Sequence, residues 1–224
     1  MMLIEKIKLK INKFIRTKYS NLRRKKLKNE DFTIISNNCW GGTIYESYNL
    51  KKSSPTIGLF FMSNDYIKFI SNIKYYLSLD IEFINPNNSN YYDYICKEKN
   101  FGKFPIGKLG DIEIFFLHYK NRKEVLSKWN RRKKRINWNK IIFKFNDQNL
   151  CDAKNVEDFV KLPYKNKLFF TVNKKFIKDK NCHRFFQFPN KKYIMASNEP
   201  FGNNHVLNIT NYLNNIQKET YFDN

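Results

Sequence analysis

The chain has 224 residues, of which 42% are hydrophobic and 17% aromatic. This is enough apolar material for one packed domain and argues against an intrinsically disordered chain. No run of about 18 consecutive apolar residues occurs, so we expect no transmembrane helix. The formal net charge of +22 invites a nucleic-acid-binding interpretation, but lysine is also common in chains rich in Asn, Ile, Phe and Tyr, so charge alone is weak evidence.

Residues 1–29 form a distinct basic extension, with eleven Lys/Arg against one acid, a local excess of 11 − 1 = +10. The spacing of apolar residues predicts an amphipathic helix over residues 3–16. Its apolar face comprises Leu3, Ile4, Ile7, Ile11, Phe14 and Ile15. Such a helix can lie on an anionic membrane surface, or it can pack on its own domain or on a second subunit.

The extension lacks both a continuous apolar signal region and a small-residue cleavage site. We therefore expect a retained segment in a cytoplasmic protein, with peripheral association at the inner face of the cytoplasmic membrane as the location that the basic helix favours. The four cysteines form no CxxC pair and the chain has three histidines, so we expect reduced thiols and no metal site.

Residues 30–224 are expected to form a single α/β domain. Strands are predicted at 32–36, 56–61, 81–84, 111–119, 140–146, 167–173 and 192–197. Helices are predicted at 63–79, 121–137, 155–162 and 206–217. This alternation predicts a largely parallel, Rossmann-like sheet flanked by helices. Residues 85–104, rich in Asn and Tyr, are expected to form a long loop or lid.

Polar residues and glycines follow the predicted strands, and in open parallel sheets ligands bind beyond the carboxyl ends of the strands. Four strand ends contribute Asn37, Asn38, Cys39, Gly41 and Gly42; His118; Asn146, Asp147 and Gln148; and Asn173. If these strands are neighbours, their ends converge on one site.

The chemistry of these residues suits a polar ligand. Glycines allow close backbone approach, and the N–H groups at the start of the following helix can hold an anion. Amides and Asp147 suit sugar hydroxyls or a ribose. His118 is the candidate general base and Cys39 a candidate nucleophile. Each has a structural alternative: Cys39 as a small buried hydrophobe, His118 as a satisfied histidine, and residues 146–149 as a turn.

The segment KWNRRKKRINWNK, residues 128–140, is a second basic cluster. Basic residues with interleaved tryptophans can bind nucleic acid through phosphate contacts and stacking. On a helix, residues 131–135 can also form a solvated ridge, or a surface that receives a pyrophosphate or lipid headgroups. We regard nucleic-acid binding as unlikely.

Three blocks together resemble a bacterial family classed as a domain of unknown function, whose members are often labelled exopolysaccharide biosynthesis proteins. The blocks begin SNNCWGGTIYESYN, FPIGKLGDIEIFFLHYKN and FVKLPYKNKLFFT. The resemblance covers roughly residues 31–200 and leaves out the basic helix. It implies a cytoplasmic α/β protein of capsule or exopolysaccharide assembly and supplies no catalytic residues or cofactor.

Combined with the strand-end residues, this resemblance favours a glycosyl or acyl transferase acting on a sugar or glycan precursor. Two alternatives stay open: a non-catalytic binding or scaffold protein of the same system, and a nucleic-acid-binding protein.

Overall fold

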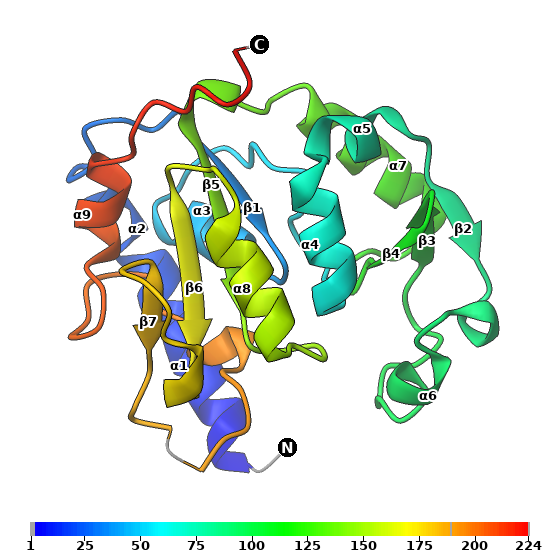
Figure 1. Ribbon diagram of the computed structural model, residues 1–224. Coiled ribbons are helices and arrows are strands. Elements are labelled where there is room, and N and C mark those ends of the chain that lie inside the picture. Colours follow the sequence, from blue (N-terminus) through cyan, green and yellow to red (C-terminus); the bar gives the residue numbers. More distant parts are fainter. Residues whose placement is uncertain (1–2, 189, 224) are drawn as a thin grey trace.

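A four-stranded parallel sheet forms the centre of the protein (Figure 1). The computed structural model describes residues 3–188 and 190–223; the side chains of residues 3–6, 8 and 9 lie outside this description. The strand order is β1 (Thr33–Ser36), β5 (Ile141–Asn146), β6 (Lys167–Thr171) and β7 (Cys182–Arg184). Every residue of β1, β5 and β6 is buried, as expected for parallel strands covered on both faces.

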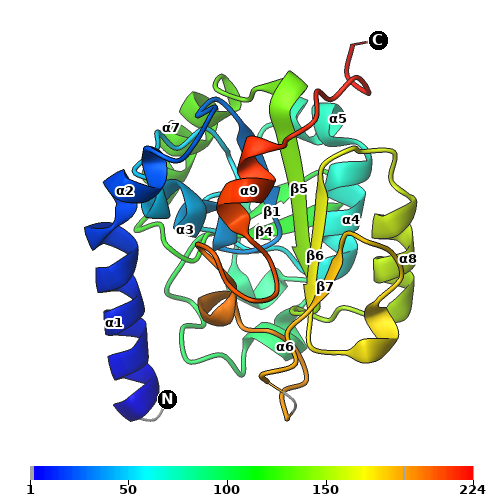
Figure 2. The ribbon, with the colours of Figure 1, turned by 90° about the vertical axis from the view of Figure 1, so that its left-hand side faces the viewer.

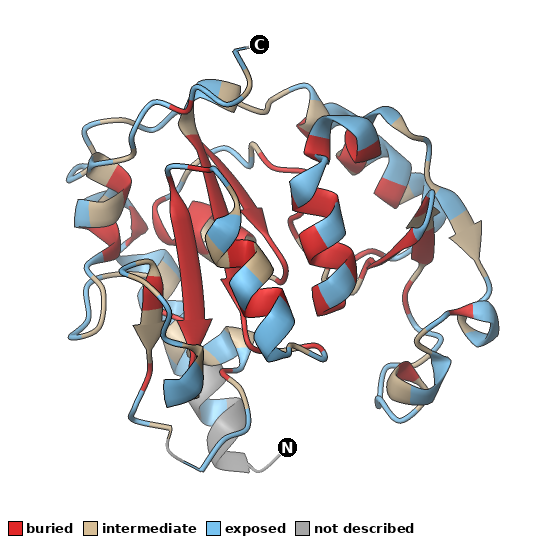
Figure 3. Ribbon diagram, viewed as in Figure 1, coloured by how far each residue is buried: buried red, intermediate tan, exposed pale blue. Residues whose placement is uncertain are grey.

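Helices cover both faces of this sheet (Figures 1 and 3). On one face, α4 (Ser63–Ser71) and α8 (Ala153–Lys161) pack against Phe143, Phe145 and Phe169. On the other face, α3 (Trp40–Ser47) and α9 (Ile209–Asn214) pack against side chains from the same strands. Because successive residues in a strand point to opposite faces, each strand supplies both halves of the core.

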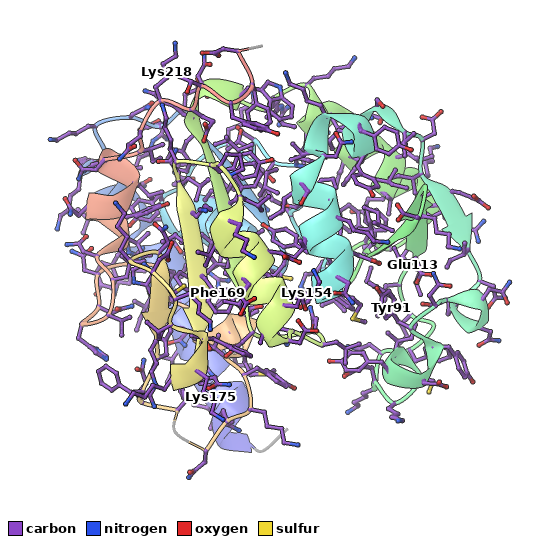
Figure 4. The ribbon with its side chains drawn as sticks, in the orientation of Figure 1. Tyr91, Glu113, Lys154, Phe169, Lys175 and Lys218 are labelled. Carbon is purple, nitrogen blue, oxygen red and sulfur yellow. The ribbon has the colours of Figure 1, made fainter. Side chains whose placement is uncertain are left out.

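A small antiparallel sheet lies beside β1, built from β2 (Glu82–Ile84), β3 (Ile106–Leu109) and β4 (Ile112–Phe115). It packs with α5 (Ile73–Ser78) and α7 (Arg122–Lys133). The segment between β2 and β3 contains the short helices η1 (Pro86–Asn88) and α6 (Tyr92–Ile95). Glu113 of β4 is directed toward this segment (Figure 4), and its carboxylate accepts hydrogen bonds from the Ser89 hydroxyl and the Asn90 N–H.

The mixed α/β class and the parallel sheet flanked by helices are confirmed. Several predicted elements are wrong in detail. Residues 56–61 form no strand, because Gly58 adopts a φ of +80° and bends the chain, leaving an isolated bridge between Phe60 and Phe115. The strand expected at 111–119 ends at Phe115 and belongs to the antiparallel sheet, and the helix expected at 63–79 is interrupted at Asn72.

The edge of the main sheet also differs from the prediction. Residues 192–197 lie in a loop that contains the 3₁₀ turn η4 (Ala196–Asn198), and the fourth strand is β7. Two further 3₁₀ turns, η2 (Trp138–Lys140) and η3 (Lys174–Phe176), precede β5 and follow β6. The segment predicted as a long loop, 85–104, is mostly irregular apart from its short helices.

At the N-terminal end, α1 (Leu3–Lys18) and α2 (Ser20–Arg24) lie along the outside of the molecule (Figure 2). Arg16 of α1 joins this helix to α3, through an ion pair with Glu46 at 2.6 Å and a hydrogen bond to Thr43. On the other side of α1, Ile11 and Phe14 are 52% and 59% exposed. The side chains of Leu3 and Ile4 lie outside the described residues. No helix in the described chain is long and apolar enough to cross a membrane.

Candidate functional site

Polar residues at the ends of β1 and β5 form a hydrogen-bonded network, in a part of the sheet whose strands are buried (Figure 3). Asn37, Asn38 and Asn146 are all buried. The Asn37 amide donates to Asn146 Oδ1 at 2.8 Å, and the Asn146 amide donates to Glu199 Oε1 at 2.7 Å. These side chains therefore do meet at the carboxyl edge of the sheet, but their hydrogen bonds are made with one another.

A lysine–glutamate ion pair lies at the centre of this network. Lys144 points from β5 toward Glu199, with its Nζ 2.5 Å from Oε1, and neither side chain is exposed. Asn38 accepts from Lys144 Nζ at 3.0 Å and donates to Glu199. Burial lowers the pKa of Lys144 and raises that of Glu199, while the attraction between the two charges opposes both shifts. Sequence patterns alone give no signal that Glu199 pairs with Lys144.

Asp147 anchors three backbone or side-chain donors. Its Oδ2 accepts from Thr171 Oγ1 at 2.6 Å and from the Val172 N–H at 2.8 Å, and its Oδ1 accepts from the Ile194 N–H at 2.8 Å. Burial raises its pKa, with these hydrogen bonds opposing the shift. The carboxylate therefore holds the ends of β5 and β6 and the loop before Glu199 together.

Three other predicted residues meet in an open pocket. Cys39, Gly42 and His118 line a cavity of about 360 Å³, next to the first turn of α3. Gly41 is buried beneath it against Ile34, and Gln148 and Asn173 are not among its lining residues. The structure thus divides most of the predicted residues between a closed network and an open pocket, and places Gly41 and the side chains of Gln148 and Asn173 in neither.

His118 reaches the pocket by a route that differs from the predicted one. It follows β4, which is not part of the parallel sheet. Its backbone N–H donates to Gly58 O at 2.9 Å, and the positive φ of Gly58 turns the 56–61 loop back toward β1. A Cβ at position 58 would stand 3.4 Å from His118 Cβ and 3.3 Å from the Tyr119 ring, so this glycine permits both the bend and the close packing.

The protonation states of the pocket residues differ. The His118 side chain is exposed and has no hydrogen-bond partner among the described residues, yet the partial burial of its ring lowers its pKa. Burial, reinforced by the negative charge of Glu199, raises the pKa of the Cys39 thiol to about 12. At neutral pH the pocket therefore offers a neutral imidazole and a protonated thiol.

The pocket is strongly cationic. Its lining includes one carboxylate, Glu46, and five basic side chains: Lys13, Arg16, Lys52, Lys128 and Arg132. Arg16 pairs with Glu46, and Lys128 pairs with Glu124. Within the described part of the chain, the other three have no carboxylate within ion-pairing distance.

Arg132 is the residue that sequence reasoning placed in the basic cluster without identifying its role. It is 6% exposed, and its Nη1 donates to Ile57 O and to the Tyr119 hydroxyl, at 3.2 and 2.7 Å.

Two neighbours of Arg132 in the basic cluster also make internal contacts: Lys133 donates to Leu77 O and Arg135 to Lys52 O. Of these five residues, Arg131 and Lys134 are exposed and Arg132 is buried, so residues 131–135 do not form a continuous solvated ridge.

Metal binding has no evident site in the described residues, since no three His, Cys, Asp or Glu side chains gather there. Oxygen, nitrogen and cationic groups line the pocket, which suits an anionic or hydroxyl-bearing ligand better than a cation.

Fold and site together define an α/β protein with a cationic pocket beyond the end of its first parallel strand. The chain belongs to the family described as "Domain of unknown function (DUF1919)", whose model matches residues 10–219. That match includes most of α1, which the sequence resemblance had left out. An uncharacterized protein of Haemophilus influenzae (strain ATCC 51907 / DSM 11121 / KW20 / Rd) is 30% identical over 167 residues, 75% of this chain and 74% of that protein.

Proposed function

We propose that this protein is a transferase that modifies or extends a polysaccharide precursor, with the pocket at the end of β1 as its active site. The observation that carries the proposal is the His118 imidazole, which opens onto the same pocket as Cys39 and the first turn of α3. Its lowered pKa favours the neutral form, which can accept the proton of a sugar hydroxyl as that oxygen attacks an activated donor.

The state of Cys39 favours glycosyl transfer over acyl transfer through a thioester. A thiol whose pKa is about 12 holds very little thiolate at neutral pH, and the thiolate is the nucleophile. We therefore assign Cys39 to the pocket wall. Asp147, with both carboxylate oxygens occupied by internal donors, is assigned a positioning role.

The link to exopolysaccharide or capsule assembly rests on the resemblance of the three sequence blocks. We also propose that the parallel sheet is Rossmann-like. This proposal is supported by the position of the pocket, since Cys39 and Gly42 follow the carboxyl end of β1, where ligands of open parallel sheets bind.

We place this activity at an anionic membrane surface, the inner face of the cytoplasmic membrane. Helix α1 supports the placement, because Ile7, Ile11 and Phe14 are exposed on the side opposite Arg16, which bonds to α3. The excess of +10 over residues 1–29 suits anionic lipid headgroups and disfavours a second copy of the same basic segment.

The test of catalysis is the variant His118→Ala in a strain from which the gene has been deleted. We expect the surface glycan to lose the modification or extension that the wild-type gene restores, with the folded protein present at wild-type level. His118→Asn, which keeps a polar side chain but cannot act as a base, should fail in the same way. Wild-type glycan from both variants would remove the catalytic assignment.

A non-catalytic binding protein of the same system is the second candidate, and the closed network favours it. Asn37, Asn38 and Asn146 hydrogen-bond within the protein, which leaves fewer groups for a substrate. This candidate predicts that purified protein binds a glycan or a partner protein without turning over sugar donors, and that His118→Ala leaves the glycan unchanged.

A further inference from the structure

We propose that the pocket contains a subsite for a phosphate monoester or diphosphate, with Arg132 as its principal ligand. This inference rests on the proposed function, because it identifies the phosphate or diphosphate group by which the pocket would hold an activated or lipid-carried precursor. The binding chemistry itself depends on Arg132 and its cationic neighbours, and it can be measured without any knowledge of the reaction.

Arg132 is a buried cation with no counter-ion among the described residues. Its side chain is 6% exposed, lines the pocket, and forms no ion pair with any described carboxylate. Both of its hydrogen bonds come from Nη1, and neither Nε nor Nη2 has a partner in the described structure. An unpaired buried charge is costly, and the free edge of a guanidinium matches two phosphate oxygens.

The neighbouring cations strengthen this preference. Lys13 and Lys52 line the same pocket, and within the described chain neither lies within 4 Å of a carboxylate. Burial lowers the pKa of Lys52, and the nearby Arg132 charge lowers it further. The positive charges repel one another, and an anion bound between them relieves this repulsion.

The first turn of α3 provides a further set of donors. Cys39, Gly42 and Thr43 line the pocket at this end of the eight-residue helix. The Trp40 and Thr43 N–H groups already donate, to Asn38 Oδ1 and Cys39 O, so the remaining N–H groups of the turn and the helix dipole are what favour an anion here. A carboxylate has two oxygens and one charge. The pocket offers three cations that have no carboxylate partner among the described residues, and a helix N-terminus. A phosphate or diphosphate has more acceptor oxygens and more negative charge than a carboxylate, so it matches these groups better.

The direct test is titration of inorganic pyrophosphate into the full-length protein by isothermal calorimetry. We expect saturable binding at one site and a loss of about 10-fold or more in affinity for Arg132→Gln, as for the removal of a charged hydrogen bond. The matched control is Arg131→Gln, which removes the same charge from an exposed neighbouring position. Equal affinity of Arg132→Gln and Arg131→Gln would overturn the subsite.

A second pair of variants covers the case in which Arg132→Gln does not fold. Lys52 and Lys51 are both exposed, but only Lys52 lines the pocket. Lys52→Gln should weaken pyrophosphate binding about two- to fivefold, as for a solvent-exposed charge pair, and Lys51→Gln should leave it unchanged. Equal effects of the two variants would show that only net charge matters and would contradict the proposal.

A soluble diphosphate and a lipid phosphate present the same chemical group to the pocket. Two binding experiments, one with vesicles and one with pyrophosphate, distinguish a lipid ligand from a soluble one. Vesicles of phosphatidic acid carry a phosphate monoester, and vesicles of phosphatidylglycerol at equal charge carry a diester. A preference for phosphatidic acid that Arg132→Gln abolishes indicates a lipid source; pyrophosphate binding without that preference indicates a soluble one. If Arg132→Gln loses the pyrophosphate binding of the wild type while His118→Ala still gives wild-type glycan, the subsite stands and the transferase assignment is refuted.

Discussion

Lys144 and Glu199 show why the chemistry of a single side chain depends on its partners. A lysine with no exposed atoms is expensive unless its charge is matched, and here the match comes from Glu199, together with Asn38. The ammonium also lies over the rings of Trp40 and Phe170, which adds a cation–π attraction. This pair therefore connects β5 to the loop after β7.

Breaking this pair should destabilise the whole domain. We expect Lys144→Met to lower the free energy of unfolding by about 3–5 kcal/mol, because Glu199 would remain buried and charged without its partner. The double variant Lys144→Met/Glu199→Leu should cost less than the sum of the two single changes. Urea denaturation measures all three, with exposed Lys134→Met as the control. A Lys144→Met protein as stable as that control would show that the pair contributes nothing.

The candidate residues could be predicted in part. Asn37, Cys39 and Gly42 follow a short apolar strand, and that local pattern was sufficient to place them at a sheet edge. The partners could not be predicted, because Glu199 lies 55 residues beyond Lys144 in a loop without periodicity. Arg132 was visible only as one of five consecutive basic residues, since no sequence pattern distinguishes the buried one.

At the scale of elements, a second buried acidic cluster holds the segment between β2 and β3. Asp65 of α4 accepts from the Glu113 N–H at 2.8 Å, while Glu113 accepts from Ser89 and Asn90. Burial raises the pKa of Asp65 to about 6, with the Glu113 charge adding to the shift. Helix α4 and strand β4 thus fix this segment through a cluster in which the pKa of Asp65 is raised.

The raised pKa predicts a pH dependence of stability. Between the unfolded value of about 3.9 and the folded value of about 6, the folded state binds more protons, so the Asp65 contribution falls as pH rises through this interval. Asn at position 65 does not titrate. From pH 4 to pH 7, the wild type should therefore lose up to about 3 kcal/mol of unfolding free energy relative to Asp65→Asn. A pH-independent difference would contradict the shift.

The elements themselves could be predicted where one apolar pattern dominated. Residues 140–146 and 167–173 are mostly apolar, as the strands of a covered parallel sheet are, and they contain β5 and β6 of the main sheet. Residues 56–61 have an equally apolar pattern, but the bend at Gly58 prevents ladder pairing. β7 has only three residues, Cys182–Arg184, and its pairing with β6 depends on tertiary context that a short polar run does not reveal.

At the scale of the whole molecule, charge and exposed apolar surface coincide on α1. Several of the large exposed apolar side chains of the described chain, including Ile7, Ile11, Phe14 and Leu22, lie within the first 29 residues, which carry the +10 excess. Lys13 and Arg16 of the same helix line the pocket. A helix held on a membrane by its outer face would therefore place the pocket beside the lipid headgroups.

This arrangement predicts vesicle binding through the outer face of α1. The variant Ile11→Ser/Phe14→Ser should bind phosphatidylglycerol vesicles about 10-fold or more weakly than wild type, because less apolar area is buried. The control, Ile177→Ser/Phe186→Ser, removes two exposed apolar side chains elsewhere and should bind normally. Flotation with vesicles measures both, and equal recovery of the two variants would refute the α1 surface.

A crystal soaked with pyrophosphate tests the position of the proposed active site. We expect a diphosphate in the pocket between α1, α3 and α7, contacting the Arg132 guanidinium and the Lys52 ammonium, with the Lys144–Glu199 pair intact beneath it. A diphosphate bound elsewhere on the protein, or one that separates Lys144 from Glu199 and occupies the network, would contradict it.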